Sequence, residues 1–378
     1  MGAKMRVNWT RAVALSVLLV LPLFQGCTKR FLQGYVDGLR WLQTRTNSQR
    51  NGTAQVVFDV LPGETAMLIT AEVGEGYQAH FRTLYDPSGA PVFQAFDWTG
   101  TEYSKTNAGY VSQVSTLNWP VSLDDPYLTP GTYTVEFGVV DSAQNYVSQP
   151  LFIDILLKED ASFTDGELRV NIIYTGDLDD DDELRAAVDE AKDRWETLYA
   201  AIGIDVDFAE LTYDKVDAIE PPAFGDGEVY GEVSASTNLR SVNVVIAPSI
   251  ISYDEIFGIA GDIPGPLVPT PRSGVLISAD LAAGPNGEFS PEERRLLAET
   301  MAHEVGHYLG LFHPVETTWE TWDVLDDTPT CDDEFECVEE LGGNLMFPFP
   351  VCAGFTCTPQ ENITEDQRTV LNRYVGVD

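Results

Sequence analysis

Three of the four histidines in this 378-residue chain lie within the stretch MAHEVGHYLGLFHP, residues 301–314. His303 and His307 are four residues apart, and side chains at that spacing lie on the same face of an α-helix. Gly310 follows within one turn, and glycine readily adopts the left-handed conformation in which many helices end. The spacing therefore predicts a helix that ends at Gly310, and a chain that turns back to bring His313 beside the other two imidazoles.

Three imidazoles in this arrangement can share one metal ion. Three protein ligands and an open fourth position are typical of a catalytic zinc site, which activates a bound water. Glu304 is rotated by about 100° from His303 around the helix axis, so it can accept a proton from that water without binding the metal. We therefore predict His303, His307 and His313 as Zn²⁺ ligands and Glu304 as the general base. The alternatives are histidines that are satisfied in a core or in solvent, and a zinc site without activity.

The pattern H-E-x-x-H-x-x-G-x-x-H resembles the signature of the metzincin metallopeptidases. Those enzymes carry a methionine turn beneath the metal, and GGNLMFPFP (342–350) offers Met346. The Asn-x-Met sequence in this stretch, together with DDTPTC (326–331), is most similar to the pappalysin family. The resemblance implies a zinc peptidase in which Met346 forms a hydrophobic floor below the metal. The family commonly places a tyrosine shortly after this methionine, where the present chain has Phe347 and Pro348.

Residues 161–378 have the order of elements expected of a metzincin-like α/β catalytic domain. The metal-binding helix begins with a capping box at Ser290 and Glu293, and a final helix over 362–374 begins with a similar cap. Before the metal-binding helix, the sequence predicts an amphipathic helix at 177–203. It also predicts four strands of a twisted sheet, at 168–174, 204–213, 242–247 and 273–279. The C-terminal lobe then carries the methionine turn. We expect the Gly/Pro-rich segment 257–274 to shape a substrate-binding edge.

Residues 53–160 contain several short apolar runs that are separated by turn signals such as DPSG and TPGT. Runs of this length and spacing predict an all-β sandwich. It resembles the accessory sandwiches of secreted bacterial proteases, so the chain is predicted to be multidomain. His80 lies in one of these runs, and we assign it no role.

The N-terminus has the features of a processing segment. Basic residues precede a thirteen-residue apolar core at 12–24, which is short for a membrane span. Cys27 follows it after Gln25 and Gly26 and resembles the lipidated cysteine of a bacterial lipoprotein. We therefore predict a signal peptide over 1–26, a lipidated tether over 27–52, and export to the cell envelope, with the outer membrane as the expected destination. Secretion after ordinary cleavage and an uncleaved anchor are the alternatives.

The other four cysteines lie between residues 331 and 357. An even cluster in an exported chain is typical of disulfides, and three pairings are open. A second zinc site is the weaker alternative, because the spacings are irregular and no C-x-x-C pair occurs. We predict two disulfides among Cys331, Cys337, Cys352 and Cys357.

The chain is strongly acidic, with 22 Lys+Arg against 60 Asp+Glu and a formal net charge of −38. This charge argues against nucleic acid as a partner, because phosphate binding requires a basic surface. It suits an exported protein and is compatible with calcium (Ca²⁺) binding. The acidic run at 179–182 precedes a predicted helix, where charge at the helix terminus is favoured over a calcium site.

Together these features predict an exported zinc-dependent endopeptidase that acts on peptides or proteins. The main alternative is a catalytically idle surface lipoprotein that binds a partner through its β-domain. A third hypothesis makes the β-domain an inhibitory pro-region. A cysteine switch on the zinc is excluded for that pro-region, because residues 53–330 contain no cysteine.

Overall fold

The computed structural model describes residues 31–95, 105–159, 163–213, 218–219, 233, 240–251, 256–284, 286–353 and 356–377. The predicted signal peptide and the lipidation site at Cys27 lie outside these residues. Within them, no helix is both long enough and apolar enough to cross a membrane.

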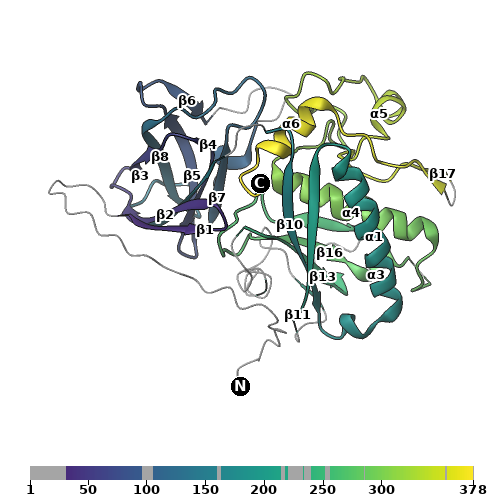
Figure 1. Ribbon diagram of the computed structural model, residues 1–378. Helices are drawn as coiled ribbons and strands as arrows, with labels where there is room; N and C mark the ends of the chain where they lie inside the picture. Colours follow the sequence, from purple (N-terminus) through teal and green to yellow (C-terminus); the bar gives the residue numbers. More distant parts are fainter. Residues whose placement is uncertain are drawn as a thin grey trace.

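The N-terminal part of the chain forms two antiparallel sheets (Figure 1). The first has the order β1-β2-β9-β4-β7, with strands Leu32–Val36, Leu39–Asn47, Pro150–Glu159, Glu64–Val73 and Val114–Trp119. The second has the order β3-β8-β5-β6, with strands Thr53–Val60, Gly131–Asp141, Tyr77–Tyr85 and Pro91–Gln94. A short 3₁₀ helix, η1 (Asn107–Gly109), precedes β7.

Alternating side chains explain why these segments are strands. In β3, Val56, Phe58 and Val60 are buried, while Val57 and Asp59 between them are exposed. This period of two is that of a strand with one face towards a core. The buried side chains of both sheets belong to one hydrophobic cluster. The N-terminal part is therefore all-β, as predicted.

The prediction of a tether over 27–52 is wrong where the structure describes that segment. Residues 32–47 form β1 and β2, so the sheets begin well before residue 53. Leu39 and Leu42 are buried, and Arg40 does not face solvent because its guanidinium pairs with the buried Glu64 at 2.5 Å. The basic residues of this segment indicated a surface tether, but the strand period buries every second side chain.

The C-terminal part is built on a five-stranded sheet of order β11-β10-β13-β16-β15. Four strands are parallel, and β15 is an antiparallel edge strand; they span Ile204–Tyr213, Gly166–Thr175, Val242–Ala247, Val275–Ser278 and Gly258–Ala260. Helices α1 (Asp182–Ala200) and α4 (Pro291–Leu309) pack against each other and against the sheet (Figure 1). The four predicted strands and both predicted helices are present. The edge strand β15 lies in the segment expected to shape the substrate-binding edge.

Shorter elements complete this part of the chain. The helices are η2 (Leu178–Asp180), α3 (Ala279–Ala282), α5 (Glu334–Leu341) and α6 (Glu365–Arg373). The strands are β12 (Ala218–Ile219), β14 (Ser249–Ile250), β17 (Cys352–Ala353) and β18 (Thr356–Cys357). The helix α6 starts with the predicted capping box of Thr364 and Gln367.

The end of the chain joins the two parts, and α6 lies between them in Figure 1. The side chain of Asn118, on β7, donates to the Arg373 carbonyl at 3.1 Å and accepts from the Val375 amide at 3.0 Å. Lys158, on β9, is buried and donates to the carbonyl of Val377. These buried contacts attach the N-terminal sheets to the C-terminal part.

Candidate metal centre

The helix α4 has the two ends predicted for it. Ser290 accepts from the amide of Glu293 at 3.3 Å, and the Glu293 carboxylate accepts from the Ser290 amide at 2.7 Å, which completes the capping box. Gly310 ends the helix with a backbone φ of 120°, a value that residues with a Cβ atom rarely adopt. The amide of Leu311 then bonds back to the Gly306 carbonyl at 3.0 Å. The chain therefore reverses immediately after the helix.

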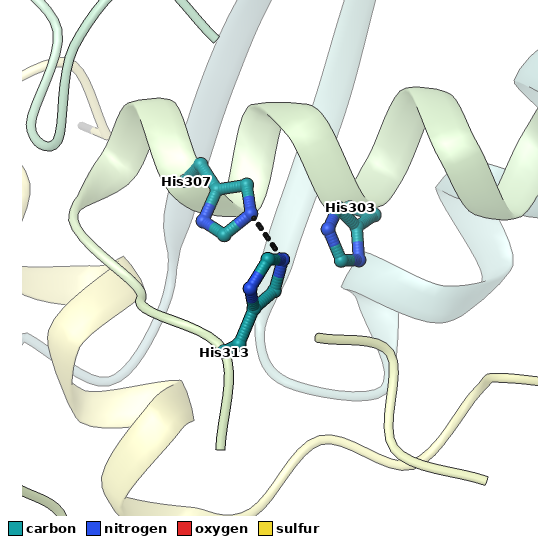
Figure 2. A group of neighbouring side chains, drawn as sticks. All are labelled: His303, His307 and His313. Atoms are coloured by element: carbon teal, nitrogen blue, oxygen red, sulfur yellow. Dashed lines mark hydrogen bonds between the residues drawn. The ribbon is translucent and has the colours of Figure 1, made fainter. Parts of the chain in front are cut away.

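This reversal brings the three histidines together (Figure 2). His303 and His307 project from the same side of α4, and His313 approaches them from the returning chain. One ligand atom from each lies within 4.8 Å of the others, and the Nε2 atoms of His307 and His313 are 3.1 Å apart. No other group of three or more metal-ligating side chains is found in the part of the chain that the structure describes.

Backbone carbonyls determine which nitrogens of the helical histidines carry a proton. Nδ1 of His303 lies 2.7 Å from the Leu345 carbonyl oxygen, and Nδ1 of His307 lies 2.7 Å from that of Leu311. A carbonyl oxygen can only accept, so each Nδ1 donates. The Nε2 atoms of the neutral rings are then unprotonated and present their lone pairs to the centre of the site.

The third histidine is oriented by a carboxylate. Nδ1 of His313 lies 2.9 Å from Oε1 of Glu316, three residues later in the chain. A carboxylate hydrogen-bonded to a ligating imidazole fixes its ring orientation and raises its basicity. Sequence reasoning missed Glu316, although its position three residues after the last histidine was a usable signal.

The converging lone pairs fit a zinc ion. The contact of 3.1 Å between the Nε2 atoms of His307 and His313 is favourable when a proton or a metal cation lies between the two nitrogens. Tetrahedral zinc with bonds of 2.0–2.1 Å separates its ligand nitrogens by about 3.3 Å, close to the separation found here. The donor set and the separation of His307 and His313 therefore fit a three-histidine zinc site.

Burial keeps the helical histidines neutral, as metal binding requires. Burial, assisted by the neighbouring His313, lowers the pKa of His303 to about 3. The same two causes, with His303 adding to them, lower the pKa of His307 well below its usual value. These two imidazoles are thus available as ligands at every physiological pH.

Glu304 is buried beside the site and faces the edge strand. Burial raises the pKa of Glu304 to about 8, and a hydrogen bond from the Ala260 amide opposes this shift. The strand approaches closely because Gly258 has no side chain: a Cβ there would lie 2.7 Å from Cγ of Glu304. Sequence reasoning identified the segment 257–274 but not the individual roles of Gly258 and Ala260, since neither lies in a recognisable motif.

Met346 packs against the helix α4. A Cβ on Gly306, between the two helical histidines, would lie 2.6 Å from the sulfur of Met346. Met346 is fully buried, and its amide donates to Oδ1 of Asn344 at 2.8 Å. The turn therefore packs its methionine directly against α4, and its Leu345 carbonyl holds His303.

The three histidines and Glu304 line a cleft with a volume of about 540 Å³. Much of its lining is apolar, including Phe257, Ile259, Phe312, Phe347 and Phe349. Among the described residues that line it there is no tyrosine. Phe347 instead packs its ring 5.1 Å from that of Phe349.

The four C-terminal cysteines form two local disulfides, Cys331–Cys337 and Cys352–Cys357. Disulfides were predicted, and the structure selects one of the three pairings. The first links Cys331, which lies before α5, to Cys337 in the middle of that helix, and the second closes the β17–β18 hairpin. Met346 lies between the two loops, not inside either.

The acidic run before α1 caps that helix. Oδ1 of Asp181 accepts from the amides of Glu183 and Leu184 at 2.9 and 3.0 Å. This is the helix-terminus role preferred in the sequence analysis over calcium binding.

Comparisons with known proteins found low similarity. No protein-family model matches the sequence, and no curated protein matches it. Among solved structures, the chain is similar to archaemetzincin from Methanopyrus kandleri, at 15% identity over 54% of this chain and 86% of that chain, with a TM-score of 0.27. It is also similar to metalloproteinase-II from Bacteroides fragilis, at 11% identity over 50% of this chain and 62% of that chain, with a TM-score of 0.28. TM-scores this low support no functional conclusion, so the function is inferred from the geometry of the site.

Proposed function

We propose that this protein is an exported zinc-dependent endopeptidase of the metzincin type. The observation that carries this proposal is the convergence of three Nε2 lone pairs, each fixed by a hydrogen bond at Nδ1, beside a buried carboxyl group in an open cleft. A structural metal site needs neither the carboxyl group nor the cleft.

Each residue of the site has a role in peptide hydrolysis. His303, His307 and His313 hold the zinc, which when bound polarises a carbonyl group and makes water more acidic. The charge of bound zinc would favour the ionised form of Glu304, which acts as the general base and then returns the proton to the leaving amine. The Ala260 amide orients the Glu304 carboxylate by donating to it. Met346 supports the helix from below.

The edge strand β15 gives the substrate a place to bind. Edge strands present backbone groups that can pair with an extended peptide. β15 passes directly beside Glu304, so a peptide paired with it would run along the histidines. The apolar lining of the cleft favours apolar substrate side chains. Because the cleft offers no tyrosine among its described residues, we assign no tyrosine to transition-state stabilisation.

Peptide-library cleavage tests this function. Purified, zinc-loaded full-length protein should cleave a set of library peptides, chelation should abolish cleavage, and added zinc should restore it. Cleavage that survives complete removal of metal would contradict the proposal. A zinc-loaded protein that cleaves no peptide or protein would favour the alternative of a surface binding protein.

We also propose that the N-terminal sheets are an accessory β-sandwich and that Cys27 is the lipidated N-terminus of the mature protein. The apolar core at 12–24, which ends three residues before Cys27, supports the anchor. Mass spectrometry of the mature protein should find lipid on Cys27, and Cys27→Ala should release the protein from membranes. An unmodified N-terminus at another residue would refute the anchor.

A further inference from the structure

One residue of the cleft, Asn107, comes from the N-terminal part of the chain. Asn107 lines the cleft together with the histidines and Glu304, although it belongs to η1. η1 is held firmly, because the buried Thr106 caps it and Ser115 of β7 donates to the Ala108 carbonyl at 3.2 Å. Asn107 is therefore presented to the cleft by a fixed part of the β-domain.

Asn107 holds the segment that follows the edge strand. The backbone amide of Asn107 donates to the Ile263 carbonyl at 2.8 Å. The side chain of Asn107 hydrogen-bonds to the carboxyl group of Asp262. Asp262 is almost fully buried, and its Oδ1 also accepts from the Ile263 amide at 2.9 Å. Asn107 thus binds both the backbone and the side chain of this segment.

The other side of the segment is held by the C-terminal part. The Gly261 amide donates to the Gly274 carbonyl at 2.9 Å, and Arg272 donates to the Gly261 carbonyl at 3.0 Å. Arg272 is also the charged group that faces Asp262. The segment follows Ala260 directly, and Ala260 is the residue whose amide donates to Glu304.

We propose that Asn107 is a positioning residue through which the β-domain completes the substrate cleft. By holding Asp262 and Ile263, it sets the place of β15 beside Glu304. The cleft is then a product of both domains, and the β-domain is a working part of the peptidase, not a removable module. This inference rests on the proposed function only for its effect on cleavage.

Asn107→Ala in the full-length chain tests the proposal. Asn145→Ala is the matched control, because Asn145 also donates to an aspartate, Asp141, but is exposed in a turn of the β-domain. Asn107→Ala should raise KM for library-derived peptides by about tenfold, as expected for the loss of a hydrogen bond to a charged group, while kcat and zinc content change little. Asn145→Ala should change none of these quantities.

Exchanging donor and acceptor separates positioning from general loss of stability. Asn107→Asp alone places a second carboxyl group beside Asp262, and KM should rise most at pH values well above 6, the approximate pKa of Asp262 in the wild type, where both carboxyl groups are ionised. Adding Asp262→Asn restores one donor and one acceptor, so the double variant should recover a KM near that of the wild type. A double variant no better than Asn107→Asp would overturn the pairing.

Hydrogen exchange provides a measurement that does not depend on activity. In Asn107→Ala the amides of residues 256–264 should exchange faster, while those of α1 and α6 keep their wild-type rates. Unchanged exchange in this segment together with an unchanged KM would overturn the proposal. If the wild type binds zinc but cleaves nothing, the proposed function fails, and exchange alone decides the role of Asn107.

Discussion

Replacing Asn344 with alanine should destabilise the protein and loosen the turn beneath the metal-binding helix. Oδ1 of Asn344 accepts from the Met346 amide at 2.8 Å and from Nε2 of Gln367 at 3.1 Å. Its Nδ2 donates to Oε1 of Gln367 at 2.9 Å. All three residues are buried, so water cannot replace the lost partner.

The size of the effect follows from the groups left without a partner. Asn344→Ala removes the acceptor of the Met346 amide and of Gln367 Nε2, whereas Gln367 Oε1 keeps its bond from the Thr364 amide at 3.0 Å. Each buried donor left unsatisfied costs about 1–3 kcal/mol. The free energy of unfolding should therefore fall by about 2–6 kcal/mol. Zinc affinity should fall as well, because the adjacent Leu345 carbonyl orients His303.

Urea unfolding and zinc titration measure both effects. Asn51→Ala is the control, because Oδ1 of Asn51 also accepts from the amide two residues later, at 3.2 Å, but in an exposed turn. Its loss should stay below about 1 kcal/mol. An Asn344→Ala variant no less stable than this control, with unchanged zinc affinity, would refute the reasoning.

Glu316→Gln should weaken zinc binding by about ten- to a hundredfold, because an amide supports His313 less well than a carboxylate does; equal affinities in a competition titration would contradict this. Reduction of the two disulfides, which close loops of six and five residues, should lower the unfolding free energy by about 2 kcal/mol each. A melting temperature that does not respond to reduction would argue against that stabilisation. Burial raises the pKa of Asp323 to about 7, so the folded state binds this proton more tightly than the unfolded state does. The stability from Asp323 is therefore present at pH 4 and is lost as pH rises to 7. Asp323→Asn should flatten the dependence of unfolding free energy on pH in this range, and an unaltered curve would count against the assignment.

Local signals made the metal-binding helix predictable from the sequence. Its start at Ser290, its end at Gly310 and the return of His313 depend on residues within one short segment. The strands over 204–213 and 242–247 were equally recognisable, because continuous or alternating apolar runs define them.

Features that depend on distant residues were not predictable in the same way. β2 pairs with β9, so that Arg40 lies opposite Leu157, and nothing near Arg40 in the sequence indicates this partner. Asn107 and Asp262 meet only because the N-terminal sheets and the C-terminal part of the chain pack together. The disulfide pairing likewise depends on distances between chain segments, which spacing alone does not determine.

Glu304→Gln tests most directly whether a carboxylate beside three histidines moves the proton in peptide hydrolysis. Zinc content and peptide cleavage should be measured on the same preparations of the wild type and this variant. One zinc per chain is expected in both, because the three Nε2 ligands remain, while cleavage should fall by about 10²–10⁴-fold. A variant that keeps its zinc and cleaves at the wild-type rate would contradict the role of Glu304, and a wild type that binds no zinc would contradict the metal site itself.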